Sequence, residues 1–171
     1  MEKAYKFRLY PNKEQELIIQ KTFGCCRFVY NHYLARRIEL YKEDKSTMNY
    51  NACSADLKEF KKSFEWLKEV DSVSLQSSIK DLDTAYQNFF REVKKGNSNQ
   101  GFPKFKSKKN NHRSYTTNNQ KGTVAIENGY IKLPKLKSVV KIKQHRLFDG
   151  LIKSYTISQT PGGKYFVSVL V

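Results

Sequence analysis

A short alternating segment near the N-terminus limits the possible folds most strongly. Apolar and basic side chains alternate along residues 3–9, which is the period of a β-strand with one buried face. The following residues, 12–95, carry helical patterns instead. A lone strand leaves its backbone polar groups unpaired, so it must pair with strands from residues 96–171. We therefore predict an α+β fold, an antiparallel β-barrel interrupted by a four-helix insert.

The predicted elements follow from periodicity and from capping residues. Asn12 and Gln15 have the spacing of a capping box, and Gly24 is expected to separate the first helix from the second. Ser72 is the expected N-cap of the clearest helix, and Gly96 its C-terminal cap. Helices are predicted at 12–23, 25–42, 51–62 and 72–94, and strands at 123–126, 130–133, 139–143, 152–158 and 164–171. The barrel domain would comprise 1–11 and 96–171, and the helical domain 12–95.

Charge is distributed unevenly along the chain. Residues 1–95 hold 18 Lys and Arg against 14 Asp and Glu, whereas residues 96–171 hold 14 against 2. The excess predicts a polyanionic partner, either nucleic acid or, as the weaker alternative, an anionic membrane surface. The two carboxylates of the second part, Glu127 and Asp149, are too few for a carboxylate-rich metal site. No apolar run suits a membrane span or a signal peptide, and we expect no cofactor and no metal.

Basic and aromatic residues alternate after the predicted polar linker that begins at Gly96. Lysines neutralise phosphates while aromatic rings stack on bases, so this segment predicts contact with nucleic acid. The alternative is a solvated loop that its two Phe residues anchor to the core. The candidates are Phe102, Lys104, Phe105, Lys106, Lys108, Lys109, Arg113, Ser114 and Tyr115. A second basic strip, which could equally be the solvated face of a sheet, comprises Lys132, Lys135, Lys137, Lys141, Lys143 and Arg146.

Weaker candidates lie in the helical part. Tyr50, Ser54 and Gln76 are polar groups near helix starts, where helix-based DNA readers contact bases, although Gln76 is equally well a surface residue. Cys25 and Cys26 with His32 suggest a thiol site only weakly, because His32 lies among Tyr and Leu on a helical face. With Cys53 they form an odd number of cysteines, and we expect reduced structural thiols.

Five stretches in order resemble one family. They are Tyr5-Lys-Phe-Arg-Leu-Tyr-Pro-Asn12, Gly24-Cys-Cys-Arg-Phe-Val-Tyr-Asn-His-Tyr-Leu-Ala-Arg36, Leu75-Gln76 with Asp81-Leu-Asp-Thr-Ala-Tyr-Gln-Asn-Phe-Phe90, Gly101-Phe-Pro-Lys-Phe-Lys106 and Ile131-Lys-Leu-Pro-Lys135. Together they resemble the N-terminal region of TnpB, the transposon-encoded RNA-guided DNA nuclease. The resemblance covers essentially the whole chain and implies roles in transposition and DNA recombination.

The resemblance implies a wedge (WED) β-barrel, similar to oligonucleotide-binding folds, interrupted by a helical recognition (REC) domain. It implies two partners, a guide RNA derived from the transposon end and double-stranded DNA that carries a short adjacent motif. Residues in positions that face this motif in the family are Tyr50, Ser54, Ser72, Val73, Gln76, Thr117 and Asn118. Ser72 and Val73 depart from the lysine and the aromatic residue that relatives can carry there. Lys104, Lys106 and the strand with Lys6 and Arg8 resemble positions that contact the nucleic-acid backbone.

The family's RuvC-like nuclease domain, with its metal-binding carboxylates, is expected C-terminal to this region. We therefore expect that this chain alone is not an enzyme and that it is truncated relative to the family. The expected location is the cytoplasm of a prokaryote, in association with the nucleoid. The first alternative is a nuclease-dead, RNA-guided or stand-alone DNA-binding transcriptional repressor derived from TnpB. Two others are a thiol enzyme that uses Cys25 or Cys26, and an assembly role for the apolar strand at 165–171.

Overall fold

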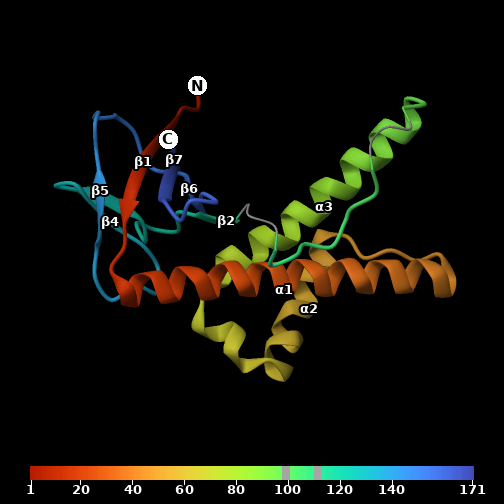
Figure 1. Ribbon diagram of the computed structural model, residues 1–171. Coiled ribbons are helices and arrows are strands. Elements are labelled where there is room, and N and C mark those ends of the chain that lie inside the picture. The colour runs from red at the N-terminus through yellow and green to blue at the C-terminus, as the bar shows by residue number, and fades with distance from the viewer. Residues whose placement is uncertain (98–100, 110–112) are drawn as a thin grey trace.

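The computed structural model describes residues 1–97, 101–109 and 113–171. Three α-helices lie beside one end of a β-sheet (Figure 1). The elements are β1 (Ala4–Tyr10), α1 (Lys13–Asp44), α2 (Tyr50–Ser63), the 3-10 helix η1 (Glu65–Glu69), α3 (Ser72–Lys94), β2 (Arg113–Asn118), β3 (Ala125–Glu127), β4 (Tyr130–Lys132), β5 (Val140–Lys143), β6 (Ser154–Gln159) and β7 (Tyr165–Leu170). None of the helices in these ranges is long and apolar enough to cross a membrane.

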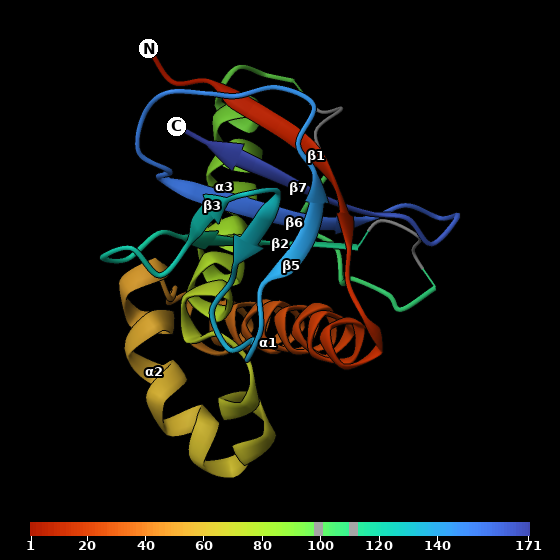
Figure 2. The ribbon, with the colours of Figure 1, turned by 90° about the vertical axis from the view of Figure 1, so that its left-hand side faces the viewer.

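The first strand pairs with strands of the C-terminal part of the chain, as predicted, and it lies in the middle of the sheet. The strand order is β2-β6-β7-β1-β5-β4-β3, and every pair is antiparallel. Leu9 pairs with Ile142 of β5 on one side and with Tyr165 of β7 on the other. Lys3 and Val171 exchange two backbone hydrogen bonds of 3.0 and 2.9 Å. The two ends of the chain therefore lie side by side, at the ends of the central strands β1 and β7 that point away from α1 (Figure 2).

The predicted closed barrel is not confirmed. In the part of the chain that the structure describes, the sheet is open, with β2 and β3 as its edge strands. Closure would require two edges long enough to pair in a matched register, whereas β3 is only three residues long. Helix α3 crosses β2 instead and packs against it at that edge (Figure 2). A helix placed in this way shields the unpaired backbone groups of an edge strand.

The prediction of four helices is also wrong in its first half. Residues 13–44 form one continuous helix, and the capping box of Asn12 and Gln15 at its start is confirmed. Gly24 lies inside this helix, where its Cβ position would have no neighbour closer than 3.8 Å. A glycine in a helix interior costs only about 1 kcal/mol relative to alanine, and buried neighbours such as Phe23 and Cys25 offset that cost.

Helix α3 matches its prediction in length but not in its cap. Asp71, not Ser72, is the N-cap, and its carboxylate accepts a hydrogen bond from the Val73 N–H at 3.2 Å. At the other end Gly96 has φ +75°, as expected for a residue that follows a helix. The predicted linker beyond Gly96 lies partly outside the described residues.

Strand β2 is absent from the predicted set of five strands. Its sequence, Arg113 to Asn118, holds only one large apolar side chain, Tyr115, and so gives a weak strand pattern. Tyr115 and Thr117 nevertheless alternate with exposed or half-buried neighbours and face the core. The five predicted strands are all present with shifted ends, and Asn128 and Gly129 form the expected tight turn with φ of 54° and 79°.

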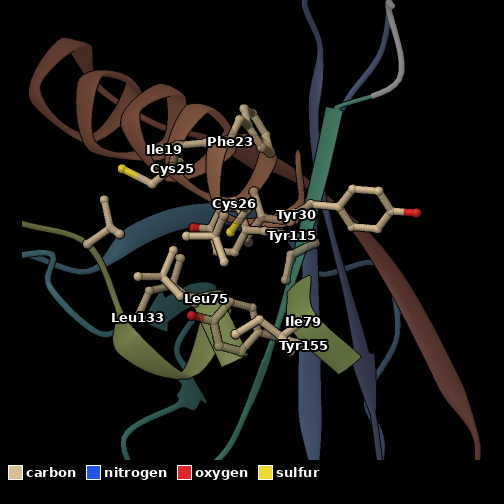
Figure 3. Packing of buried hydrophobic residues seen from close by; sticks show 14 of the residues in the cluster. Ile19, Phe23, Cys25, Cys26, Tyr30, Leu75, Ile79, Tyr115, Leu133 and Tyr155 are labelled. Atoms are coloured by element: carbon tan, nitrogen blue, oxygen red, sulfur yellow. The ribbon is translucent and has the colours of Figure 1, made fainter. Parts of the chain in front are cut away.

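One hydrophobic core links the helices to the sheet. Side chains from α1 and α3 meet Tyr115 of β2 and Tyr155 of β6 (Figure 3). The ring of Phe23 meets the ring of Tyr115 edge-on, with 5.5 Å between their centres. Because this core is continuous, the proposed division into 1–11 with 96–171 and 12–95 is not visible as two separate cores and stays a prediction.

Candidate nucleic-acid interface

A groove runs between the first half of α3 and the edge strand β2, and we call it the β2–α3 groove. Its volume is about 380 Å³, and Tyr50 at the start of α2 contributes to its lining. The lining residues are Tyr50, Val73, Gln76, Ser77, Lys80, Asp81, Thr116, Asn118 and Gln120. Four of the seven residues predicted to face duplex DNA, namely Tyr50, Val73, Gln76 and Asn118, therefore come together from three separate elements.

Local structure holds the two helix starts in place at this groove. Asn49 caps α2 by accepting a hydrogen bond from the Ala52 N–H at 3.0 Å, and Tyr50 follows directly. The ammonium of Lys80 lies 5.1 Å from the centre of the Tyr50 ring, so a cation–π contact joins α3 to α2. Gln76 and Lys80 are one helical turn apart and share a face of α3.

The other three residues predicted to face DNA do not line the groove. Ser54 is half-buried one turn beyond Tyr50, and Ser72 is exposed at the first position of α3. Thr117 is buried, and its hydroxyl donates a hydrogen bond of 2.8 Å to the Asp71 carboxylate. Thr116 and Asn118 flank Thr117 and point to the opposite face of β2, so they line the groove and Thr117 does not. The hydrogen bond of Thr117 to Asp71 instead holds β2 against the start of α3.

The basic segment at 101–109 is attached to the helices by its backbone. Asn31 of α1 donates a hydrogen bond to the Lys106 carbonyl and accepts one from the Lys106 N–H, both at 2.8 Å. The Lys106 ammonium lies 4.2 Å from the centre of the Tyr30 ring. Phe102 packs edge-on against Tyr86 and Phe89, as the alternative of an anchored loop predicts.

The remaining candidates in and after this segment fall into two groups. Lys104, Phe105, Lys108 and Lys109 are exposed and remain free to meet a ligand. Tyr115 is buried in the core, where desolvation raises the pKa of its hydroxyl well above the usual value, so its ring is not offered to a base. Arg113 is half-buried and donates hydrogen bonds to Gln20 and Gln159.

A second basic surface covers the outer face of the sheet, and we call it the basic sheet face. Arg8 pairs with Lys143 across β1 and β5, and both side chains lie on the face opposite Phe7 and Leu9. Lys6 lies over the ring of Phe166 at 4.8 Å, and Arg8 lies between Tyr10 and Phe166. The basic sheet face comprises Lys6, Arg8, Lys132, Lys141 and Lys143.

This face has the mixed character that a nucleic acid requires. Strands β1, β5 and β7 contain no Asp or Glu, and the carboxylate that the strand pairing places on this face is Glu127 of β3, opposite Tyr130. Tyr10 and Tyr130 are exposed on the same face and offer flat apolar surfaces beside the cations. The other members of the predicted second strip, Lys135, Lys137 and Arg146, lie in loops. The basic sheet face could not be inferred from the sequence, because only the pairing of the strands brings its residues together.

The geometry gives no support to the thiol-enzyme alternative. Burial raises the pKa of Cys26 to about 12 and that of Cys25 to about 11, so neither is ionised near neutral pH. His32 stacks on the ring of Phe60 with 3.8 Å between centres, and burial lowers its pKa. The three cysteines are buried and free. The described residues hold no group of three His, Cys, Asp or Glu that could bind a metal ion.

Several lining residues are not among the predicted ones. Lys80 could have been found, because it follows Gln76 by four residues on the same helical face. Thr116, Gln120 and Asp81 have no sequence signal of their own, since only the packing of α3 against β2 places them in the groove. The contact role of Asn31 could likewise not be predicted from the sequence, because its two partner atoms belong to the backbone of a segment 75 residues away.

Residues 1–46 match a helix-turn-helix domain family, HTH_OrfB_IS605. Within this range the structure has strand β1 followed by the unbroken helix α1, without a turn between two helices. The match therefore identifies a DNA-binding, transposition-associated class of protein, while the local geometry differs from that of a helix-turn-helix.

Three curated proteins are similar to this chain. It is 36% identical over 168 residues to InsQ of Escherichia coli (strain K12) and 35% identical over 176 residues to a protein of Streptomyces pristinaespiralis, both named as RNA-guided DNA endonucleases. These alignments cover 97% and 99% of this chain but only 39% and 41% of the relatives. It is also 32% identical over 117 residues to the virulence protein VsdF of Salmonella dublin, covering 63% of this chain and 95% of VsdF.

The class is thus that of transposition-associated, DNA-binding proteins. More narrowly, the chain belongs to the TnpB family, as its sequence resemblance predicts. It spans about two fifths of the length of the two endonuclease relatives that it matches.

Proposed function

We propose that this chain is the nucleic-acid recognition region of a TnpB-like RNA-guided DNA endonuclease. It binds a guide RNA and a short duplex DNA motif beside the RNA's target. The observation that carries the proposal is the convergence of Tyr50, Val73, Gln76 and Asn118 in one groove between α2, α3 and β2. Relatives named as RNA-guided DNA endonucleases support the choice of both nucleic acids.

The β2–α3 groove suits duplex DNA in its chemistry. The amides of Gln76 and Asn118 can each donate and accept hydrogen bonds, which is the pattern that reads an adenine edge. Tyr50 and Ser54 follow the same face of α2, and Ser72 lies exposed at the start of α3. Lys80 beside Tyr50 supplies a cation for a backbone phosphate. A helix that presents its first turns to a base edge is a common mode of DNA reading.

The basic sheet face and the exposed lysines of residues 101–109 suit the RNA. They offer cations next to exposed aromatic rings, namely Tyr10, Tyr130 and Phe105. Such surfaces bind the phosphate backbone electrostatically and let unpaired bases stack. The proposal assigns recognition to this chain and assigns no step of DNA cleavage to it.

The domain division follows from the same proposal. Residues 1–11 and 96–171 would form the wedge domain that holds the RNA, and residues 12–95 the recognition domain. In this scheme the DNA motif lies at the boundary, because α2 and α3 belong to one domain and β2 to the other. Thr117 and Asp71 join the two across that boundary with a hydrogen bond of 2.8 Å.

The test uses the purified chain with any nucleic acid that co-purifies, which is sequenced. Selection from a randomised duplex library then identifies a preferred DNA motif, and fluorescence anisotropy measures affinity between about 50 and 200 mM salt. We expect affinity for both RNA and DNA to fall by about 10³-fold or more over that range if six or more phosphates are contacted. A flat salt response, or selection without any enriched motif, would contradict the proposal.

A further inference from the structure

A second, smaller cavity adjoins the β2–α3 groove and is lined mainly by polar groups. Its volume is about 230 Å³, and it lies between α1, α3, β2 and the segment at 101–109. Arg27, Lys106 and Arg113 enter it from three different parts of the chain, together with one carboxylate, Asp81. We call it the cationic pocket. Asp81 and Thr116 line both the pocket and the groove, so the two spaces are neighbours.

Two of the three cations, Arg113 and Lys106, are held by uncharged groups. One Nη atom of Arg113 donates to Gln20 at 3.1 Å and to Gln159 at 3.3 Å, which are both uncharged. Lys106 is fixed through its backbone by Asn31 and lies over the ring of Tyr30. Arg27 forms no hydrogen bond or ion pair with any residue that the structure describes. A pocket with three cations and one carboxylate keeps an excess of positive charge, which favours an anion.

Size and lining decide which anion fits. The two aromatic rings at its wall, Phe23 and Tyr115, are buried in the core, so no open ring face is offered to a base. The remaining wall carries hydroxyls, such as those of Ser114 and Thr116, which suit phosphate oxygens. About 230 Å³ accommodates a phosphate with part of its sugar but not a base pair.

We propose that the cationic pocket binds one backbone phosphate of the nucleic acid that occupies the β2–α3 groove. This inference rests on the proposed function, because it assigns a contact to the same ligand. Asp81 lines both spaces, so its carboxylate partly balances the cations and opposes the binding of a phosphate. Desolvation raises the pKa of Asp81, and the charge of Lys106 opposes this rise.

The first experiment tests the pocket without nucleic acid. Inorganic phosphate is titrated into the ¹⁵N-labelled chain at pH 7, and the side-chain Nε signals of Arg27 and Arg113 are followed by NMR. Both signals should shift with one saturation curve. Arg27→Gln should weaken binding by about tenfold, as expected for loss of a charged hydrogen bond. Arg36→Gln, an exposed arginine of the same helix, is the matched control and should leave the curve unchanged.

Asp81→Asn provides a test in the opposite direction. Removal of its negative charge should strengthen phosphate binding by about threefold or more, and a damaged fold cannot produce such a gain. Arginine signals that do not move, or weaker phosphate binding by Asp81→Asn, would overturn the proposal that the cationic pocket binds phosphate.

The second experiment repeats the comparison with RNA and duplex DNA by fluorescence anisotropy. Arg27→Gln should weaken, and Asp81→Asn strengthen, the binding of whichever nucleic acid occupies the groove. Nucleic-acid binding that neither substitution changes would overturn the pocket and leave the proposed function intact. Phosphate binding by a chain that binds no nucleic acid would overturn the proposed function and, with it, the assignment to a backbone phosphate.

Discussion

The hydroxyl of Thr117 donates a hydrogen bond of 2.8 Å to the carboxylate of Asp71, which joins the edge strand β2 to the N-cap of α3. The other oxygen of the same carboxylate accepts from the Val73 N–H. One carboxylate therefore sets both the start of α3 and its distance from β2. Since Gln76 of α3 and Asn118 of β2 both line the β2–α3 groove, we expect the contact to influence its width.

Thr117→Val should lower the free energy of unfolding by about 1–2 kcal/mol, because it removes a buried hydrogen bond while keeping the side-chain shape. It should also change which DNA motif is preferred, since α3 is then free to shift against β2. Urea unfolding and motif selection measure the two effects. Thr117→Ser, which keeps the hydroxyl, should retain the wild-type motif, and a motif unchanged in Thr117→Val would argue against this role.

Gln76→Ala should alter sequence preference without altering the salt dependence of binding. The side chain offers an amide to a base edge but carries no charge to a phosphate. Discrimination at one base pair should fall by about 1–3 kcal/mol. Motif selection on the variant checks this result, and an equal loss of affinity for all DNA sequences would remove Gln76 from the reading residues.

Lys104→Glu combined with Lys106→Glu should weaken binding to every RNA and DNA sequence. Each lysine that contacts a phosphate contributes about one unit to the slope of log affinity against log salt concentration, so the slope should become shallower by about two. Anisotropy over a salt series measures it. A double substitution at exposed lysines that line neither the β2–α3 groove nor the cationic pocket, Lys42→Glu with Lys62→Glu, controls for net charge and should have a clearly smaller effect.

Asn31→Ala should release the segment at 101–109 from α1, because both hydrogen bonds to the Lys106 backbone are lost. We expect faster cleavage by trypsin at Lys104 and Lys106 in limited proteolysis, and a small loss of stability of about 1 kcal/mol. Asn31→Asp keeps an acceptor for the Lys106 N–H but has no donor for the Lys106 carbonyl. Its rate of cleavage should therefore lie between those of the wild type and Asn31→Ala. Proteolysis of Asn31→Ala at the wild-type rate would show that other contacts hold the segment.

Asp81 should make the stability of the chain depend on pH in a direction opposite to that of most carboxylates. Its pKa is raised in the folded state, so the folded chain holds the proton more tightly than the unfolded chain. The penalty is present at neutral pH and disappears as the pH falls through the raised pKa. Asp81→Asn should therefore raise the Tm at pH 7, and the difference from wild type should shrink toward acidic pH. A constant difference across that range would contradict the assignment.

Local patterns in the sequence were sufficient for most of the elements. The alternation at residues 3–9 and the capping box at Asn12 and Gln15 depend on neighbouring residues, so strand β1 and the start of α1 could be predicted. The continuity of α1 through Gly24 could not, because the packing of its buried face outweighs the local cost of glycine. Strand β2 was missed because its inward pattern becomes evident only when α3 lies against it.

The site likewise has residues that could be named from the sequence and contacts that only the tertiary structure shows. The family-derived residues Tyr50, Val73, Gln76 and Asn118 were named from the sequence, and the structure brings them to one groove, although their contact with DNA stays a prediction. Their positions in the chain say nothing of their separation in space. The inward orientation of Thr117 and the meeting of Arg27, Lys106 and Arg113 around Asp81 depend on the packing of distant elements.

By itself the sequence determined the family, the basic second part of the chain, and the need for the first strand to pair with later ones, since composition and short-range periodicity encode all three. Only the tertiary structure decided that the sheet is open, that α3 packs against its edge, and that a groove and a cationic pocket adjoin there. The physical reason is that these features arise from contacts between residues far apart along the chain, whose energies depend on shape and burial and leave no local pattern.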